Sequence, residues 1–363
     1  MRIVYISHLS LVASTGPNYS VPGRIDAQSK IDDVYWVNIS GVIKDEWKSK
    51  SYFHDSKEIG GLSLSNVEKH FPNIDIVVFE GFYNRQQVLF SKELVKRGIS
   101  YIIVPRSSLT RQAIHNHAWL KKKFAHWLYF DSYCHKAKAI QYLTKRELDD
   151  SGNKWSKNNL IIPNGINIPV NKKETFFDNG FHAVYVGRID VYQKGIDILL
   201  KACEKEKEYL RSNQFRLTLY GPQIIDFEYV VSLINNLGIG DFVEMGGEVL
   251  GKEKEKAILN GDLFILTSRF EGHPMGLIEA LAYGLPSLVT PGTNMAKEIT
   301  EANAGWVCDT NVESIQKALR QIINSKDDLY KKSTNARMLA SQYDWMQIAR
   351  KFHFEISNLI SAE

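Results

Sequence analysis

The stretch 262–292, DLFILTSRFEGHPMGLIEALAYGLPSLVTPG, constrains the fold more than any other part of this sequence. Residues 263–266 form a short apolar run that suits a strand buried on both faces, and 267–274 have the composition of a loop. Residues 276–283 carry good helix formers at helical spacing, and Gly284 and Pro286 end this helix before another strand. This order is typical of an α/β protein with a parallel sheet.

The loop of this stretch has the composition of an anion site. The segment Gly-His-Pro-Met-Gly lies between Glu271 and Glu279 and would bring backbone N–H groups close to a ligand. The N-terminus of the following helix would point unpaired N–H groups at the crevice beyond the strand ends, where a diphosphate fits. The two carboxylates would accept hydrogen bonds from sugar hydroxyls. The alternative is an ordinary β-α-β unit with an exposed Glu271 and a solvated Glu279.

The pattern Glu-Gly-x-Pro-x-Gly-x-x-Glu-Ala-x-Ala-x-Gly-x-Pro resembles the signature of family 4 glycosyltransferases. These are retaining enzymes that use nucleotide sugars and have the two-domain GT-B fold. The resemblance places Glu271 against the donor sugar, in a catalytic position, and Glu279 on the nucleotide ribose. It assigns the binding of the sugar and the phosphates to the loop residues His273, Pro274, Met275, Gly276 and Leu277.

Composition excludes several classes of protein. The chain has 363 residues, enough for two domains, and its formal net charge of +4 does not indicate a strongly basic nucleic-acid binder. Three widely spaced cysteines, Cys134, Cys203 and Cys308, are interpreted as buried apolar residues in a reducing compartment. We find no metal-binding motif and no run of 18 apolar residues, and residues 3–6 suit a first strand better than a signal peptide. The sequence therefore predicts a cytoplasmic protein.

The first half of the chain alternates apolar runs with helical patterns. Strands are predicted at 2–7, 34–39, 74–79, 101–104, 139–142 and 160–162, with helices at 86–97 and 145–151. A polar loop is predicted at 14–22, where the resemblance places Gly16 against the donor diphosphate, although a surface turn at Gly16-Pro17-Asn18 is an equal alternative. The absence of a GxGxxG sequence there argues against a dinucleotide dehydrogenase.

Two further features of this half remain open. Pro105-Arg106-Ser107 resembles the Pro-Arg-Gly of polysaccharide-building transferases, so Arg106 either faces the donor sugar or the acceptor, or is a surface arginine. Ser107 replaces the glycine of that pattern and leaves the backbone path uncertain. Residues 115–129, HNHAWLKKKFAHWLY, combine lysines with aromatic residues. They form either a helix on an anionic membrane surface, peripheral to the inner face of the cell membrane, or a core helix with a solvated face.

The second half contains a predicted phosphate clamp. Strand 183–186 is followed by Gly187-Arg188 and then by Lys194-Gly195, similar to the phosphate-binding corner of the family. Arginine offers a fork for two phosphate oxygens and lysine a compact charge. Strands at 216–220, 242–245 and 305–307 and helices at 312–323 and 345–360 follow, and the resemblance places Gly221 in the nucleotide pocket. Two solvated cations would be the alternative reading of Arg188 and Lys194.

We therefore expect an α/β chain with the GT-B fold, made of two Rossmann-like domains with parallel sheets that face each other across a cleft. The domains are 1–168, on the acceptor side, and 169–342, which binds the nucleotide sugar, with a helix at 343–363 that packs back on the first. The expected activity is metal-independent, retaining transfer of a sugar, from a UDP-sugar by family frequency, to a glycan or lipid-linked saccharide in cell-surface polysaccharide synthesis. No cofactor and no nucleic-acid partner are expected. The rivals are a nucleotide-sugar epimerase, a phosphorylase and a non-catalytic binding module.

Overall fold

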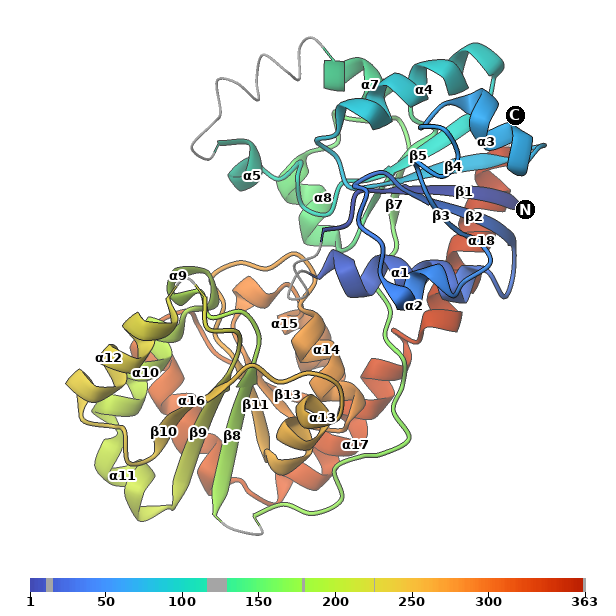
Figure 1. The fold of residues 1–363 in the computed structure, drawn as a ribbon. Coiled ribbons are helices and arrows are strands. Elements are labelled where there is room, and N and C mark those ends of the chain that lie inside the picture. Colours follow the sequence, from blue (N-terminus) through green and yellow to red (C-terminus); the bar gives the residue numbers. More distant parts are fainter. Residues whose placement is uncertain (11–15, 116–128, 178–179, 225, 362–363) are drawn as a thin grey trace. The chain divides into compact units, whose positions relative to one another are not determined.

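The computed structural model describes all residues except 11–15, 116–128, 178–179, 225 and 362–363. The chain divides into two compact units, one made of Met1–Gly165 with Trp345–Glu363 and one made of Ile166–Asp344 (Figure 1). Each unit has its own sheet, and every strand pair in both sheets is parallel. Residues 116–128, nearly the whole of the segment for which membrane contact is predicted, lie outside the described part.

The first unit is a seven-stranded sheet in the order β3-β2-β1-β4-β5-β6-β7. Its strands are β1 (Arg2–Ser7), β2 (Asp33–Asn38), β3 (Phe53–Asp55), β4 (Ile76–Glu80), β5 (Ser100–Val104), β6 (Ala139–Tyr142) and β7 (Asn159–Ile161). Its helices include α1 (Pro17–Gln28), α2 (Asp45–Lys48), α3 (Leu64–His70), α4 (Arg85–Arg97), α5 (Arg111–His115), α7 (Asp131–His135), α8 (Lys145–Ser151) and α18 (Trp345–Ser361).

Both faces of this sheet are covered by helices. Successive residues of a strand point to opposite sides of the sheet, so neighbouring residues of one strand enter different cores. On β1, Val4 and Ile6 join a core with α3 and α4, whereas Ile3 and Tyr5 join a second core with α1 and α18. The C-terminal helix α18 packs against α1 and is drawn red in Figure 1. The predicted return of the last helix to the first unit is thereby confirmed.

The second unit has a six-stranded sheet in the order β10-β9-β8-β11-β12-β13. Its strands are β8 (Phe181–Val186), β9 (Phe215–Tyr220), β10 (Val243–Gly247), β11 (Leu263–Leu266), β12 (Ser287–Val289) and β13 (Gly305–Val307). Its helices include α9 (Val191–Lys194), α10 (Ile196–Lys205), α11 (Lys207–Ser212), α12 (Phe227–Leu237), α13 (Gly251–Asn260), α14 (Met275–Ala282), the 3-10 helix η2 (Pro291–Thr293), α15 (Ala296–Glu301), α16 (Val312–Asn324) and α17 (Asp328–Ser341).

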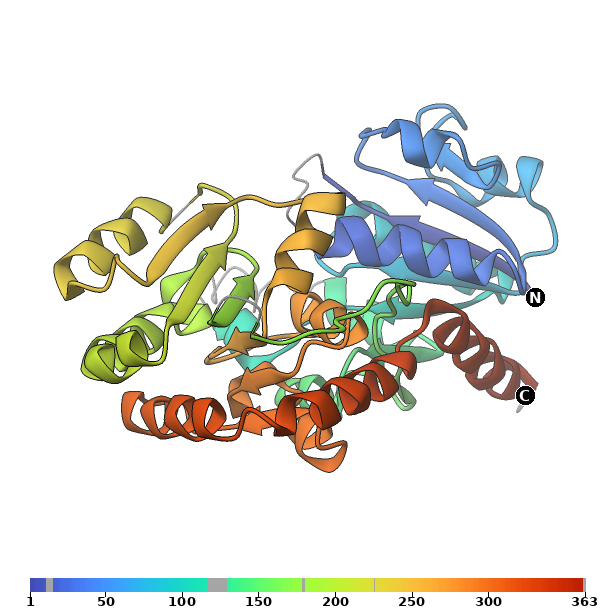
Figure 2. The same ribbon diagram turned by 90° about the horizontal axis from the view of Figure 1, so that it is seen from below.

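The helices of the second unit pack in layers: α10 contacts α12 and α16, and α14 contacts α17. Figure 2 shows α16 and α17, coloured orange-red, following one another along one side of this unit. The chain enters this sheet at the central strand β8, adds β9 and β10 on one side, and then adds β11, β12 and β13 on the other side of β8. The order of the strands therefore reverses between β8 and β11. In such doubly wound sheets ligands bind beyond the carboxyl ends of the strands at this reversal. The expectation of two Rossmann-like units with parallel sheets is confirmed.

One prediction for the first unit is wrong. Residues 17–22 do not form a polar loop but the beginning of α1, and Pro22 lies inside this helix. Proline is well tolerated at the first helical position, where Pro17 stands. The helix is retained because it buries Val21 and Ile25 against the sheet and places Arg24 in the interior, so tertiary packing overrides the local turn signal.

Candidate functional site

Three loops of the second unit meet at the carboxyl ends of β8, β9 and β11. The close approach of these loop backbones explains why glycine is needed at three of the positions named in the sequence analysis. A Cβ atom on Gly221 would lie 2.2 Å from the carbonyl oxygen of Gly187, and one on Gly276 would lie 2.6 Å from that of Val186. Gly195 has a φ of +65°, and its Cβ would lie 2.1 Å from the carbonyl oxygen of Thr267. The loops therefore form one continuous surface at this edge.

Lys194 and Glu271 contact each other at this edge, although they are far apart in the sequence. Their Nζ and Oε1 atoms are 2.6 Å apart, and only 14% and 7% of the two side chains are exposed. Ser268 also donates to Oε1 of Glu271, at 2.6 Å. The pair joins the end of α9 to the loop after β11, so two residues that were predicted from separate motifs form one cluster.

Arg188 follows β8 on the same surface and is 41% exposed. Its guanidinium group donates to Gln193 Oε1 at 2.5 Å and lies 3.6 Å from Asp190 Oδ2. The carbonyl of Arg188 accepts a hydrogen bond of 2.6 Å from the Tyr185 hydroxyl, which burial keeps protonated by raising its pKa well above the ordinary value. The chain thus holds the backbone of Arg188 in place and leaves its side chain accessible to an anion.

The loop before α14 is held by Asn294, a residue that sequence reasoning missed. Asn294 has a φ of 62°, and its side-chain amide donates to the carbonyl oxygens of Glu271 and, at 3.1 Å, of Gly272. The only sequence signal is an asparagine directly after a Pro-Gly-Thr turn. Fixing these two carbonyls orients the loop that leads to His273, whose ring centroid lies 5.5 Å from that of Tyr343.

Helix α14 begins after Pro274 and has no side-chain hydrogen bond at its N-terminus. The N–H groups of Leu277 and Ile278 bond to the Pro274 carbonyl, and those that precede them point outward, as at any helix start. Leu277 is fully buried and presents only its backbone to a ligand, whereas Met275 is partly buried against the core.

Glu279 of α14 forms an ion pair with Lys254 of α13. Lys254 is the second partner that sequence reasoning missed, because no motif in the sequence around Lys254 indicates a contact with Glu279. The pair is partly exposed, with 26% of the Glu279 side chain accessible. Its carboxylate remains in a position to accept hydrogen bonds at the edge of the sheet.

Gly16 and Arg106, the two remaining predicted contacts, lie in the first unit. Gly16 is not in a strained turn: its φ is −48°, and its carbonyl accepts hydrogen bonds from the backbone and the hydroxyl of Ser20 as α1 begins. Arg106 is not a surface arginine, because only 10% of its side chain is exposed. That alternative is wrong: Arg106 is an interior residue at the end of β5.

The Arg106 side chain belongs to a buried polar network. Nε donates to Glu80 Oε2 at 2.9 Å, and NH1 donates to Ser20 Oγ at 2.9 Å and to Asn164 Oδ1 at 3.3 Å. Arg24 holds the other oxygen of Glu80, at 3.1 Å. The network ties α1, the end of β4 and the segment after β7 together, so that Arg106 positions the carboxyl edge of the first sheet.

The backbone conformation at Arg106 and Ser107 explains why the Pro-Arg-Gly pattern, which Pro105-Arg106-Ser107 resembles, has glycine at its last position. Their φ values are 50° and 65°, which is the left-handed region that favours glycine. Glu147 offsets part of this strain by accepting the Ser107 N–H at 2.5 Å and the Leu143 N–H at 2.7 Å. Burial raises the pKa of Glu147, and these backbone hydrogen bonds oppose the increase.

Within the part of the chain that the structure describes, no group of three or more His, Cys, Asp or Glu side chains is arranged to hold a metal ion. In the same part, no helix has both the length and the apolar composition needed to cross a bilayer. The described charged groups at the carboxyl edge of the second sheet include Arg188, Lys194, Glu271 and Glu279.

A comparison with known protein families finds a match for the part of the chain that forms the carboxyl edge of the second sheet. Residues 168–338 match the model of the group 1 glycosyl transferases, a segment that contains β8 to β13 and all the predicted residues of the second unit. This segment, 171 of the 363 residues, is similar to the group 1 glycosyl transferases. The predicted clamp and the Glu271 loop lie within the matched residues.

Two curated glycosyltransferases are similar to part of the chain. An uncharacterized glycosyltransferase of Methanocaldococcus jannaschii is 27% identical over 180 residues, which cover 46% of this chain and 42% of that protein. The putative colanic acid biosynthesis glycosyltransferase WcaL of Escherichia coli is 27% identical over 125 residues, 33% of this chain and 30% of WcaL. The chain thus matches less than half the length of these relatives.

Solved structures show the same fold over the whole chain. Sucrose-phosphate synthase from Thermosynechococcus elongatus has a TM-score of 0.75 at 15% identity and covers 100% of both chains. HepE from Anabaena, solved in complex with UDP and glucose, has a TM-score of 0.70 at 15% identity and covers 99% of this chain and 100% of its own. At these identities the likeness establishes the fold, which is the GT-B fold of two Rossmann-like units.

Proposed function

We propose that this chain is a retaining glycosyltransferase that moves a sugar from a nucleoside diphosphate donor, a UDP-sugar, to a hydroxyl group of an acceptor. The observation that carries the proposal is the contact between Lys194 and Glu271, beside Arg188 and the start of α14. Two cations and a helix N-terminus at the carboxyl edge of a doubly wound sheet suit a diphosphate. The presence of UDP in the HepE structure supports uracil as the base of the donor nucleotide.

Donor binding would redistribute the contacts of Lys194. A diphosphate at this edge competes with Glu271 for the ammonium group, whereas Glu271 keeps the hydrogen bond from Ser268. The carboxylate is then held in place with acceptor capacity for sugar hydroxyls. Arg188, which is exposed and anchored through its carbonyl, would turn its fork to the phosphate oxygens. We assign the ribose hydroxyls to Glu279, and the approach to the sugar and phosphates to the loop 273–277.

The reaction needs stabilisation of the leaving group above all. The acceptor oxygen forms a bond to the anomeric carbon, the bond from that carbon to the phosphate oxygen breaks, and its electron pair leaves with the nucleoside diphosphate. The acceptor hydroxyl loses its proton in the same reaction, and the departing diphosphate, which gains the electron pair of the broken bond, can accept it. Arg188, Lys194 and the first N–H groups of α14 would stabilise the negative charge that develops on the diphosphate, a role that such preorganised donors perform well. Glu271 is proposed to position the sugar.

We propose a glycan or lipid-linked saccharide as the acceptor, in the synthesis of a cell-surface polysaccharide. The name of the Escherichia coli relative, which is putatively assigned to colanic acid biosynthesis, supports this proposal. The mixed basic and aromatic composition of 115–129 is consistent with a cytoplasmic enzyme that meets such an acceptor at the membrane surface. Transfer assays with lipid-linked and free saccharide acceptors, each with and without anionic vesicles, test this part of the proposal.

The clamp is tested by the double variant Arg188→Ala, Lys194→Ala. Each charge-assisted contact is worth about 1.5–3 kcal/mol, so we expect kcat/KM to fall by about two to four orders of magnitude. The melting temperature should also fall, because Lys194→Ala leaves the buried Glu271 carboxylate without its cationic partner, and kcat/KM is therefore measured at a temperature at which circular dichroism shows the variant to be folded. The matched control is Lys201→Ala, Lys331→Ala, which removes two exposed cations of α10 and α17. Wild-type turnover in the clamp variant would refute the assigned diphosphate site.

The base and the reaction class need separate assays. Thermal stabilisation by UDP, GDP and ADP ranks the bases, since a ligand that binds only the native state raises apparent stability according to its affinity. Incubation of the donor alone, followed by analysis of the sugar, separates a transferase from an epimerase. An isomerised sugar in the absence of acceptor would contradict the proposed transfer.

A further inference from the structure

An exposed aromatic side chain stands beside the Lys194–Glu271 ion pair of the second unit. Tyr192 of α9 precedes Lys194 by two residues, and Phe270 directly precedes Glu271. The ring centroids of Tyr192 and Phe270 lie 6.3 Å apart, within the range of aromatic pairs, and the ring planes are tilted by 58°. The aromatic pair and the ion pair therefore join the same two segments at the carboxyl edge of the sheet. Tyr192 is nevertheless 68% exposed.

The neighbouring side chains restrain the Tyr192 ring. The Arg269 guanidinium lies over this ring, with Cζ 4.8 Å from the ring centroid. The guanidinium is itself fixed, because Nη1 and Nη2 donate to the two carboxylate oxygens of Asp197 at 2.7 and 2.8 Å. Nη1 also donates to the Tyr192 carbonyl at 2.8 Å. An exposed ring with this support loses little conformational entropy when a ligand binds to it.

Hydrogen bonds also fix the two segments that carry the rings. The Arg269 N–H donates to the Gln193 carbonyl at 2.8 Å, and the Gln193 side chain donates to the Phe270 carbonyl at 3.3 Å. Asp190 caps α9, because its side chain accepts the Gln193 N–H at 2.8 Å. Tyr192 is therefore part of the same preformed edge on which the donor site is proposed.

The surroundings of the ring indicate a saccharide as its ligand. The faces of a pyranose carry C–H groups, which the negative face of an aromatic ring attracts, and the rim of the pyranose carries hydroxyl groups. The loop before α9 supplies partners for such hydroxyl groups: the Arg188 side chain is 41% exposed and the Asp190 carboxylate is 24% exposed. An acyl chain in this place would desolvate both charged groups without replacing their hydrogen bonds to water.

The exposure of the neighbouring side chains indicates which saccharide reaches Tyr192. Only 7% of the Glu271 side chain, against which the donor sugar is proposed to lie, is exposed, and Lys194 is 14% exposed. Tyr192 lies on the open side of this edge. The ribose is proposed at Glu279, whereas Tyr192 contacts the residue before Glu271, so the ring lies at the sugar end of the donor. A saccharide on Tyr192 therefore meets the donor sugar from the solvent side, as an acceptor does.

We propose that Tyr192, supported by Arg269 and Phe270, stacks on a pyranose ring of the acceptor and directs one of its hydroxyl groups to the anomeric carbon of the donor sugar. The inference rests on the proposed transfer function and adds the chemical class of the acceptor, which is a sugar ring and not a lipid alcohol without one. Tyr192 contacts this acceptor through the face of its ring, so the role needs the aromatic ring and not the phenolic hydroxyl group.

The experiment is saturation-transfer NMR of the full-length chain in the presence of saturating UDP. The probes are the methyl pyranosides of glucose, galactose and mannose, and sorbitol serves as a polyol without a ring. We expect at least one pyranoside to bind more tightly than sorbitol. Tyr192→Ala should weaken its binding at least tenfold, Tyr192→Phe should bind it as the wild type does, and both variants should keep the affinity for UDP. Tyr229→Ala, which removes a 57% exposed tyrosine of α12, is the matched control.

A further variant separates the acceptor position from the donor position. Glu271→Gln should leave pyranoside binding unchanged, because the donor sugar and not the acceptor is proposed to lie against this carboxylate. Binding that is lost in Glu271→Gln and kept in Tyr192→Ala would place the probe in the donor-sugar position and overturn the inference.

Three other results decide between this inference and the proposed function. If UDP binds but no pyranoside does, or if Tyr192→Ala binds the pyranoside as tightly as the wild type, the acceptor contact is refuted and the donor site stands. Equal affinity for the pyranosides and sorbitol would also refute it, because no ring would then be recognised. If UDP does not bind, the proposed donor site fails and this inference fails with it. Equal melting temperatures without ligand establish that the Tyr192 variants fold as the wild type does.

Discussion

At the scale of single residues, Arg106 is where structure and resemblance assign different roles. An arginine side chain that faced the donor sugar or the acceptor would keep N–H groups free to bind that substrate. The described contacts of Arg106 are instead to Glu80, Ser20 and Asn164. From this burial and this set of partners we propose that Arg106 acts as a positioning residue. Its loss leaves a buried carboxylate with one cationic partner fewer.

We therefore expect Arg106→Ala to lower the free energy of unfolding by on the order of 3 kcal/mol, as is typical when one partner of a buried ion pair is removed. The matched control is Arg97→Ala, because Arg97 pairs with Glu68 at 3.6 Å and is 65% exposed. That variant should cost less than about 1 kcal/mol. Urea unfolding measures both. A stable Arg106→Ala protein that has lost transfer activity would instead support direct contact with a substrate.

The cysteines give a prediction that concerns ionisation. All three are free and buried, and burial raises the pKa values of Cys203 and Cys308 to about 12. The reactive thiolate is therefore scarce at neutral pH. We expect the native protein to react with a thiol reagent only at the rate of unfolding, and the denatured protein to react at once. Rapid labelling of native protein at pH 8 would contradict their placement in the core.

At the scale of elements, the C-terminal helix α18 completes the core of the first unit. Phe352 of this helix is fully buried, and the Arg24 guanidinium lies 4.4 Å from its ring centroid. Gly23 of α1 allows the close approach, since a Cβ there would lie 2.7 Å from Trp345 Nε1. Helix α18 therefore belongs to the first unit even though it follows the second in the sequence.

Two phenylalanines of α18 form a matched test of this packing. We expect Phe352→Ala to lower the free energy of unfolding of the first unit by about 3–5 kcal/mol, because it removes a buried ring and leaves a cavity. Phe354 is 63% exposed, and Phe354→Ala should change the free energy by less than about 0.5 kcal/mol. Thermal and urea unfolding report both. Similar losses for the two variants would show that α18 is not packed through Phe352.

At the scale of the whole molecule, the two units differ in continuity along the chain. The second unit, Ile166–Asp344, is one uninterrupted segment, whereas the first combines Met1–Gly165 with Trp345–Glu363. The core of the second unit contains residues of that segment only, and one core of the first includes Trp345, Phe352 and Ile356. Domains with their own core fold independently in many proteins.

We expect the fragment 166–344 to fold alone and to keep UDP binding, since the proposed clamp lies within it. The fragment 1–165 should be much less stable than the first unit of the full chain, because it lacks the apolar face of α18. Circular dichroism melts and UDP titration of the separate fragments test this expectation. A fully cooperative melt of 1–165 at the temperature of the full chain would contradict it.

The sequence determined most strands, because buried parallel strands are short apolar runs between turn residues. The predicted bounds 263–266, 139–142 and 145–151 agree with β11, β6 and α8. The motif spacing also placed Arg188, Lys194 and Glu271 in the segments that follow β8 and β11, and parallel strands bring such segments to one edge. By contrast, the sequence did not predict α1, because the local run of Gly, Pro and Asn at 16–18 and Pro22 favour a turn. The segment is helical because a helix buries Val21 and Ile25 against the sheet.

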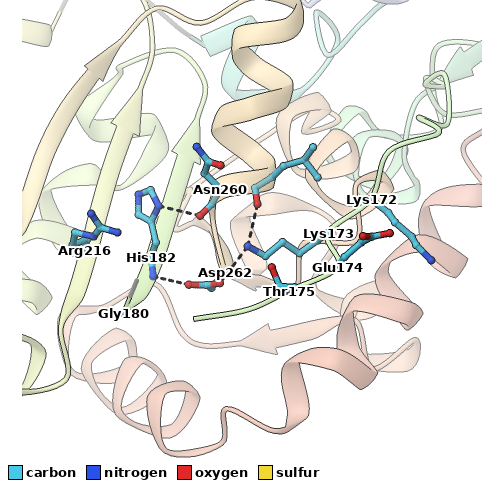
Figure 3. A pocket seen from close by; sticks show the side chains of 10 residues that line it. Lys172, Lys173, Glu174, Thr175, Gly180, His182, Arg216, Asn260 and Asp262 are labelled. Atoms are coloured by element: carbon cyan, nitrogen blue, oxygen red, sulfur yellow. Dashed lines mark hydrogen bonds and ion pairs between the residues drawn. The ribbon is translucent and has the colours of Figure 1, made fainter. Parts of the chain in front are cut away.

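The sequence by itself determined which residues stand at the carboxyl ends of the strands, because hydrophobic runs and glycines are local properties of the chain. Only the tertiary structure decided which side chains are partners: Lys194 with Glu271, Lys254 with Glu279, and Arg106 with Glu80. These contacts join residues that are distant in sequence, and they depend on strand order, register and the depth at which each side chain is buried. A pocket at the amino edge of the second sheet, lined by Lys172, His182 and Arg216 among others, has the same origin, because its walls come from segments that no local pattern connects (Figure 3).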